Sequence, residues 1–200
     1  MSLINDLYKI QKIDLNNAVN VLTDAFSEES MWKEVFNDED KNRVLTEVMV
    51  RFCLKYGNVL STSENLEGVM AITPHDKDMT ALRVIRSGGF FLSMKIANES
   101  KKLKVLSNTI EEAKKSLDLD PYIHLLIMGV SREFQGKGFG GKLIRAVIEK
   151  SETERKPIYL ETQKEENVSL YEKYGFSVKK KINLPEPLNL PMWLMVRDVK

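Results

Sequence analysis

A glycine-rich loop, Gln135–Gly140, separates an apolar run from an amphipathic stretch and constrains the fold more than any other feature. The preceding run, residues 122–130, is apolar except at His124 and predicts a short buried strand. Four apolar residues recur at helical spacing after the loop: Leu143, Ile144, Val147 and Ile148. This spacing predicts a helix from about residue 140 to 154. The order is therefore strand, glycine-rich loop, helix.

Such a loop suits the binding of a phosphate group. Glycine lets the backbone approach an anion closely, and the free N–H groups of the first helical turn point towards it. Three cationic residues, Arg132, Lys137 and Lys142, lie nearby in the sequence. We therefore expect an anion site at the start of this helix.

One interpretation is a dinucleotide fingerprint, Gly136-x-Gly138-x-x-Gly141, with Glu161 as the ribose-binding acid twenty residues further on. Two features argue against it. Five mostly polar residues separate Val130 from the first glycine, and too little chain follows Glu161 for the further parallel units that this fold requires.

A second interpretation is a P-loop, Gly136-x₄-Gly141-Lys142. The next position is Leu143, where a P-loop carries the hydroxyl that binds Mg²⁺. Both interpretations therefore explain fewer residues than a third.

The pattern Gln135-x-x-Gly138-x-Gly140 resembles the acyl-CoA pyrophosphate loop of the GCN5-related N-acetyltransferase (GNAT) superfamily. The resemblance continues in order through the strand Ile158–Glu161, the stretch Asn167–Phe176 and a closing strand around Trp193. It covers residues 122–199, and its later motifs are similar to those of the branch that includes puromycin N-acetyltransferase-like enzymes.

The resemblance implies an α+β fold in which a central, mostly antiparallel mixed sheet is splayed at the acyl-CoA site and flanked by helices. About forty residues separate the predicted hairpin from the strand at 122–130, so we expect a helical insertion around residues 75–120, placed beside the acceptor entrance or acting only as a packing appendage. With 200 residues, the chain is expected to form a single acyltransferase domain, residues 1–200.

Hydrophobic periodicity and turn residues predict the other elements. The predicted strands are 7–13, 58–63, 68–73, 157–162, 177–182 and 192–199. The predicted helices follow Asp14 and span 38–56, 101–115 and 165–174. Residues 27–38 are expected to be a loop that carries Met31, Trp32, Val35 and Phe36.

Composition excludes several classes of protein. A net charge of +1 argues against a nucleic-acid partner. No apolar run has membrane-spanning length, and residues 1–12 lack a signal-peptide core, so no membrane partner is expected. The single cysteine, Cys53, falls on an apolar helix face and indicates a buried thiol in a reducing compartment. We therefore expect a cytoplasmic protein.

The resemblance also assigns the acetyl-CoA site. The pyrophosphate is expected on the backbone of Gln135, Gly136, Lys137, Gly138, Phe139 and Gly140. The pantetheine arm is expected along Met128, Gly129 and Val130, where the strand separates from its neighbour and a backbone N–H would polarise the thioester. Asn167 corresponds to a position that contacts the cofactor, although an Asn there could equally be a helix N-cap.

Three residues are candidates for proton transfer. Tyr171 lies where many family members carry the tyrosine that protonates the departing CoA thiolate, although it could simply pack its helix against the sheet. His124, on the same predicted strand face as Val130, is a candidate base, although a structural histidine is more common. Glu161 is a rival for the base or for binding a cationic amine.

The resemblance implies a cytoplasmic, acetyl-CoA-dependent N-acetyltransferase that joins acetyl-CoA and a small primary amine in a ternary complex. No metal-ligand cluster is evident in the sequence, so no metal is expected. A homodimer is possible, with an interface near residues 192–199. A protein or peptide N-acetyltransferase and a non-catalytic acyl-CoA-binding regulator are the alternatives.

Overall fold

A computed structural model describes residues 3–27, 30–36 and 38–200. Within these residues seven strands form one sheet in the order β1-β2-β3-β4-β5-β7-β6. Only the β4–β5 pair is parallel. The strands are Tyr8–Lys9 (β1), Asn58–Ser61 (β2), Gly68–Pro74 (β3), Ile123–Val130 (β4), Ile158–Thr162 (β5), Ser177–Asn183 (β6) and Pro191–Arg197 (β7).

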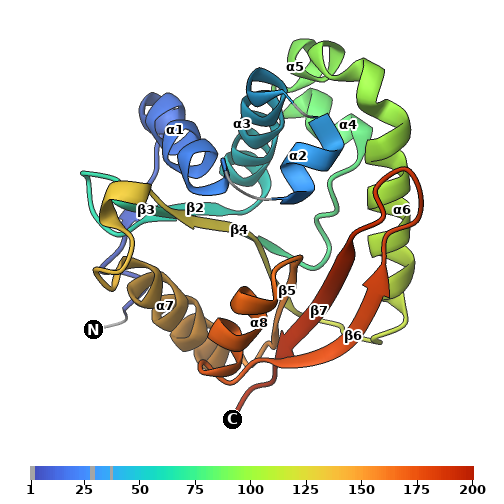
Figure 1. The fold of residues 1–200 in the computed structure, drawn as a ribbon. Helices are drawn as coiled ribbons and strands as arrows, with labels where there is room; N and C mark the ends of the chain where they lie inside the picture. Colours follow the sequence, from blue (N-terminus) through green and yellow to red (C-terminus); the bar gives the residue numbers. More distant parts are fainter. Residues whose placement is uncertain (1–2, 28–29, 37) are drawn as a thin grey trace.

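Helices cover both faces of the sheet (Figure 1). The α-helices are Leu15–Phe26 (α1), Ser30–Phe36 (α2), Glu39–Tyr56 (α3), Ala81–Arg86 (α4), Phe90–Lys95 (α5), Ser100–Lys115 (α6), Phe139–Glu154 (α7) and Glu165–Glu172 (α8). Short 3-10 turns span Lys12–Asp14, Ala97–Glu99 and Arg132–Phe134. α7 and α8 lie on one side of the sheet, and α1 and α3 lie on the other.

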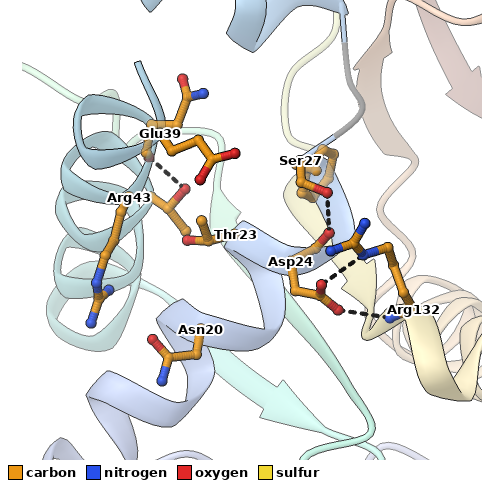
Figure 2. Close-up of a pocket in the computed structure, with 10 residues that line it drawn as sticks. Asn20, Thr23, Asp24, Ser27, Glu39, Arg43 and Arg132 are labelled. Atoms are coloured by element: carbon orange, nitrogen blue, oxygen red, sulfur yellow. Dashed lines mark hydrogen bonds and ion pairs between the residues drawn. The ribbon is translucent and has the colours of Figure 1, made fainter.

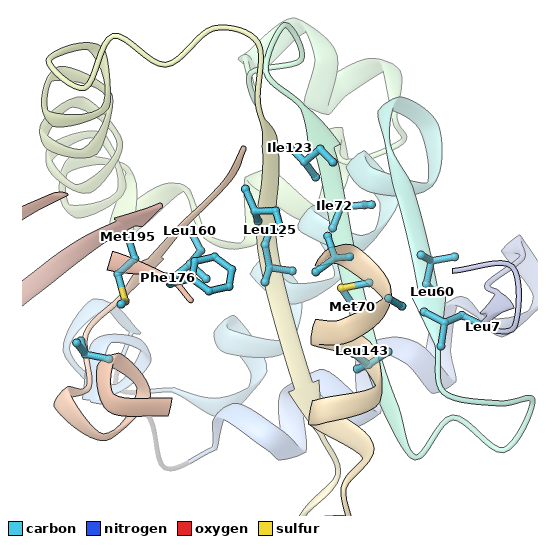
Figure 3. Close-up of a cluster of buried hydrophobic side chains, with 14 of the residues drawn as sticks. Leu7, Leu60, Met70, Ile72, Ile123, Leu125, Leu143, Leu160, Phe176 and Met195 are labelled. Carbon is cyan, nitrogen blue, oxygen red and sulfur yellow. The ribbon is translucent and has the colours of Figure 1, made fainter. Parts of the chain in front are cut away.

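The core is divided between these two faces. On the first face, α7, through side chains such as Leu143, and α8 bury side chains of β2 to β5 and β7, including Met70 and Leu160 (Figure 3). On the second face, α1 and α3 pack on β1 to β4. The remaining part of that face, over β5 and β7, is covered by α6 and by the loop that carries Leu184 and Leu188. The strands β2 to β5 and β7 are therefore buried on both sides, with a change of covering helices at the β4–β5 boundary, whereas most residues of β6 are exposed.

The α+β fold with a mostly antiparallel mixed sheet is confirmed. The helical insertion is confirmed as well, since α4, α5 and α6 all lie between β3 and β4. α3 begins after Asp38, whose side chain accepts a hydrogen bond from the Lys41 N–H at 3.1 Å, as an N-cap does. Cys53 is fully buried, as its helical spacing predicted, and burial raises the pKa of its thiol.

Two local predictions were wrong. The predicted strand over residues 7–13 pairs with β2 at only two positions, and a 3-10 turn follows at Lys12–Asp14. The predicted loop at 27–38 contains α2, in which Val35 and Phe36 are buried. Large apolar side chains there pack into the core under α6. The side chains of Met31 and Trp32 lie outside the described part of the chain.

Candidate active site

The site is built around a gap between β4 and β5. The two strands are paired at only two positions, with Ile123 opposite Ile158 and His124 opposite Tyr159. Beyond these pairs both strands continue, but among the described residues no further pair joins them. The strands therefore separate towards their C-terminal ends, as the resemblance implied for the acyl-CoA site.

The backbone of β4 presents polar groups to this gap. The Ser131 N–H donates to the Glu67 carbonyl at 3.0 Å, and Val130 lies opposite Gly68. Backbone groups alternate in direction along an antiparallel strand, so those of Val130 and Met128 point away from β3. They face the side from which β5 has turned away and are placed to bind an extended arm, as a partner strand would be bound.

The glycine loop connects β4 to the N-terminus of α7. Gly136 and Gly138 have positive φ angles of 75° and 89°, which other residues adopt only with strain. Gly138 is also the N-cap of α7, and a Cβ at either glycine would meet nothing within 4 Å. Backbone conformation, not crowding, therefore requires glycine here, and the first N–H groups of α7 are available to an anion.

Side chains of the loop hold its shape. The Gln135 amide donates to the Val130 carbonyl at 3.1 Å and so ties the loop to the end of β4. Phe139 packs edge-on against Phe134 at 5.8 Å, and the Lys137 ammonium lies 5.2 Å from the Phe134 ring centroid. Gly140 has ordinary backbone geometry, and a Cβ there would lie 3.7 Å from Val130. Within the loop, Gly136 and Gly138 are thus the glycines that the backbone requires.

Two of the three predicted phosphate-binding cations are committed to other partners. The Arg132 guanidinium contacts the Asp24 carboxylate at 2.8 Å, and the Lys142 ammonium donates to the Thr62 carbonyl at 2.6 Å. Both contacts join the loop region to its neighbours. The cradle therefore depends mainly on backbone N–H groups, with Lys137 as the exposed cation beside it.

The structure brings His124 and Glu161 together at the base of the gap. The His124 Nε2 lies 2.8 Å from the Glu161 Oε2, and the two side chains are only 15% and 12% exposed. From the sequence, His124 and Glu161 were alternative candidates for the catalytic base. In the fold they form a hydrogen-bonded pair, one member on each of the two separating strands.

The surroundings of Glu161 favour its charged form. Burial alone raises the pKa of this carboxyl, but the charge and hydrogen bond of His124, with help from Tyr159 and Lys114, hold it below its usual value. Burial is the main cause, and the charge of Glu161 the second, that raises the pKa of the Tyr159 phenol. The Tyr159 hydroxyl makes no hydrogen bond of normal geometry to a described residue, but it lies close enough to Glu161 to help lower the pKa of that carboxyl. A carboxylate beside an imidazole is an arrangement that supports a base.

The inserted helix α6 reaches this pair. The Lys114 side chain is only 14% exposed, and its ammonium contacts the Asp78 carboxylate at 3.0 Å. Its charge lowers the pKa of both Tyr122 and Glu161, although burial is the larger effect on Tyr122 and raises that pKa overall. The insertion therefore contributes to the electrostatics of the site, beyond its packing.

The prediction that His124 and Val130 share a strand face was wrong. The register between β3 and β4 shifts at a bulge, where Ala71 pairs with Ile127 but Ile72 pairs with Leu125. The extra residue reverses the alternation of side chains. His124 therefore faces the aromatic side chain of Tyr159 on the second face, whereas Val130 faces α7 on the first.

Tyr171 lies on the first face, across the sheet from the pair. It is half-buried at the C-terminal end of α8, packs against the first core and lies 5.4 Å from the Phe176 ring. Asn167 is not an N-cap, because Lys164 occupies that position of α8. The Asn167 amide instead donates to the Thr162 hydroxyl at 3.3 Å, at the end of β5.

Sequence reasoning missed two residues that shape the site. Asp24, at the end of α1, accepts hydrogen bonds from the Ser131 hydroxyl and the Arg132 N–H at 2.9 and 2.8 Å. These bonds fix the chain as it leaves β4, and an isolated acid in a helix gives no signal of such a role. The other is Gly141, which from the sequence was considered only as part of the dinucleotide and P-loop patterns; a Cβ there would lie 2.7 Å from the Tyr174 hydroxyl.

Gly129 also has a structural explanation. A Cβ at this position would lie 2.6 Å from that of Ala25, so α1 packs directly on the strand.

The dinucleotide interpretation fails on two observations. The described strands of the sheet include one parallel pair only, and the Glu161 carboxylate is hydrogen-bonded to His124. Among the described residues no cluster of three or more His, Cys, Asp or Glu could hold a metal ion, and no helix is long and apolar enough to cross a membrane.

Comparisons with known proteins agree with this geometry. The profile of the acetyltransferase (GNAT) domain matches residues 104–178. An uncharacterized N-acetyltransferase from Schizosaccharomyces pombe is 26% identical over 95% of this chain and 82% of its own length. A Corynebacterium glutamicum structure, described as histone acetyltransferase HPA2 and related acetyltransferase, superposes with a TM-score of 0.63. It is 17% identical and covers 97% of this chain and 96% of its own.

Residues 104–178 thus match a GNAT acetyltransferase domain, and the chain has the fold of these enzymes. The domain match and the N-acetyltransferase relative support acetyl-CoA-dependent acetyltransferase activity, as the resemblance implied. The polyamine N-acetyltransferase of Drosophila melanogaster has the same fold, with a TM-score of 0.64 at 12% identity over 96% of this chain and 99% of its own. The comparisons support the GNAT superfamily without favouring the puromycin-like branch.

Proposed function

We propose that this protein transfers the acetyl group of acetyl-CoA to the primary amine of a small molecule, by direct attack in a ternary complex. The observation that carries the proposal is the His124–Glu161 pair at the base of the gap, where β4 and β5 cease to pair. The polyamine N-acetyltransferase with the same fold supports a small amine as the acceptor.

In this proposal acetyl-CoA lies along the first face. Its pyrophosphate binds the N–H groups of residues 135–140, and its pantetheine arm binds the outward-facing backbone of Met128 and Val130. Asn167, on α8, is hydrogen-bonded to Thr162 at the end of β5 and is proposed to contact the arm. One backbone N–H of β4 would stabilise the negative charge that develops on the thioester oxygen.

The amine approaches from the second face. Its nitrogen attacks the thioester carbon, and its proton passes to His124, directly or through water, while Glu161 stabilises the imidazolium that forms. The C–S bond breaks, and the Tyr171 hydroxyl gives its proton to the thiolate. Since Tyr171 lies across the sheet from the pair, the acid and the base act from opposite sides of the gap.

A direct test is thiol release from acetyl-CoA with two sets of acceptors at matched concentrations: small amines such as polyamines and arylalkylamines, and short peptides with free N-termini or lysines. We expect turnover with small amines and a kcat/KM at least about tenfold lower with peptides. Faster turnover of peptides would contradict the proposed substrate class. Acetyl-CoA binding without turnover of any acceptor would contradict the mechanism.

Three further predictions accompany this proposal. Residues 1–200 act as a single acyltransferase domain, the enzyme works in the cytoplasm, and it can form a homodimer through the region of β7. Sedimentation equilibrium over a range of protein concentrations checks the last of these.

A further inference from the structure

The helices α1 and α3 turn polar side chains towards each other (Figure 2). Residues at spacings of three and four on each helix line a cavity of about 280 Å³. From α1 they are Asn20, Thr23 and Asp24, followed by Ser27 just after its end, and from α3 they are Glu39, Asn42, Arg43 and Thr46. Phe26 and Arg132 complete the lining. Helices normally pack through apolar stripes, so a polar seam of this length is not explained by folding alone.

Three atoms of this seam have unused hydrogen-bonding capacity. The Thr23 hydroxyl, the Asn42 amide oxygen and the Arg43 Nη1 are all buried and have no hydrogen-bond partner within the described part of the chain. Buried polar atoms without partners destabilise a fold, and most are satisfied by protein, water or ligand. The three residues that carry these atoms all line one cavity, which indicates something that binds there.

The charges in the cavity indicate what kind of molecule would fit. Asp24 is already satisfied by Arg132 and Ser131, whose hydrogen bonds lie between 2.8 and 2.9 Å. Among the residues that line the cavity, Arg43 is a cation whose buried Nη1 has no partner within the described residues. Glu39, which also lines the cavity, is exposed to solvent. A guanidinium binds a carboxylate well, while an amide oxygen and a carboxylate accept hydrogen bonds from an ammonium group.

We propose that the cavity between α1 and α3 binds a small zwitterion of the free amino-acid type. Its carboxylate contacts Arg43 and the Thr23 hydroxyl, and its ammonium group lies towards the Asn42 amide oxygen and Glu39. The cavity volume suits a small amino acid with a few water molecules, since one water occupies about 30 Å³.

This cavity is separate from the catalytic gap. Gly129 of β4 is covered by another side of α1, where Leu22 and Ala25 contact the strand, and Phe26 lies between the two sides. The cavity meets the end of β4 at Asp24 and Arg132, since Asp24 borders the cavity and also holds Ser131 and Arg132. The ligand is thus a second molecule beside the substrates, and its binding does not depend on the proposed acetyl transfer.

Binding can be measured on the full chain by calorimetry and thermal shift, with glycine, L-alanine and L-serine as probes. Propionate and ethylamine, each of which carries only one of the two charges, are the matched control molecules. We expect one or more of the amino acids to bind with Kd below about 10 mM and to raise Tm, and the single-charge molecules to bind at least about tenfold more weakly.

Variants locate the site. Arg43→Met should weaken binding at least about tenfold, because it removes the charge that pairs with the carboxylate. Arg51→Met is the matched control on the same helix, since Arg51 is paired with Glu47 at 2.8 Å and does not line the cavity, and it should leave binding unchanged. His124→Gln should also leave it unchanged.

Three results would overturn the proposal. Failure of every amino-acid probe to bind up to about 10 mM would mean that the cavity holds only water. Equal effects of Arg43→Met and Arg51→Met would place the binding elsewhere. Acetylation of the bound amino acid, with a raised KM in Arg43→Met, would make the cavity part of the acceptor site.

Discussion

The two sides of the β4–β5 gap are built in different ways. On the side of α7, the proposed contacts to acetyl-CoA come from backbone groups, and Gly136 and Gly138 are required because of their φ angles. On the opposite side, chemistry depends on two side chains, His124 and Glu161, contributed by different strands. The cofactor side should therefore be sensitive to backbone changes, whereas the acceptor side should be sensitive to changes of functional group.

The largest effect should come from Gly138→Glu. A side chain at a φ of 89° strains the loop, and its negative charge lies where the pyrophosphate binds. We expect calorimetry to show at least a hundredfold loss of acetyl-CoA affinity, with folding checked by circular dichroism. Lys137→Ala is the matched control and should cost less than about tenfold, since one exposed cation adds little to a backbone cradle. Equal losses would mean that side-chain charge, not the backbone, holds the cofactor.

Tyr171→Phe should lower kcat by about a hundredfold while acetyl-CoA affinity stays within a few-fold of wild type, because the ring still packs beside Phe176 but the proton donor is gone. Steady-state kinetics measures kcat, and calorimetry on the same sample measures the affinity for acetyl-CoA. A variant with normal kcat would restrict Tyr171 to packing, and the thiolate would then be protonated by another group.

Gly129→Val should destabilise the fold by about 1–3 kcal/mol, because α1 leaves no room for a side chain on β4. Urea unfolding measures this difference. Gly140→Ala is the control, since a Cβ there would make only an ordinary contact at 3.7 Å, and it should change stability by less than about 1 kcal/mol. Equal stability of the two variants would show that α1 can move away from the strand.

The smallest effect concerns pH. The pKa of Glu161 is lower in the folded chain than its ordinary value of 4.5. A carboxyl of this kind contributes stability that is complete above its unfolded pKa and is lost as pH falls through the folded value. The free energy of unfolding of the wild type should therefore fall more steeply below about pH 4.5 than that of Glu161→Gln. Parallel curves from urea titrations at several pH values would show that Glu161 is not held in its charged form.

The difference between the backbone-built cofactor side and the side-chain-built acceptor side also explains what could be predicted from the sequence. The glycine loop was predictable because a backbone cradle needs glycine at fixed spacing, and that spacing is local. The separation of β4 from β5 followed from the resemblance of this loop to that of the GNAT superfamily. The interpretation of Tyr171 as a proton donor had the same source and stays a prediction.

The arrangement on the acceptor side could not be predicted in full. His124 and Glu161 are thirty-seven positions apart, and their contact requires the parallel pairing of β4 with β5. The bulge near Leu126 leaves no clear mark in an apolar run, so the face of His124 was assigned wrongly. The polar seam between α1 and α3 was missed because its residues resemble ordinary solvent-facing positions until the two helices are seen side by side.

The most direct test of the account is a double-mutant cycle on the pair. Rates of thiol release would be measured with saturating acetyl-CoA and the best small amine for wild type, His124→Gln, Glu161→Gln and the double variant. If the pair acts as one base, His124→Gln should lower kcat by about 10²- to 10⁴-fold, and adding Glu161→Gln should cost no more than a few-fold further. Independent effects that multiply in the double variant, or an unchanged kcat in His124→Gln, would contradict the account.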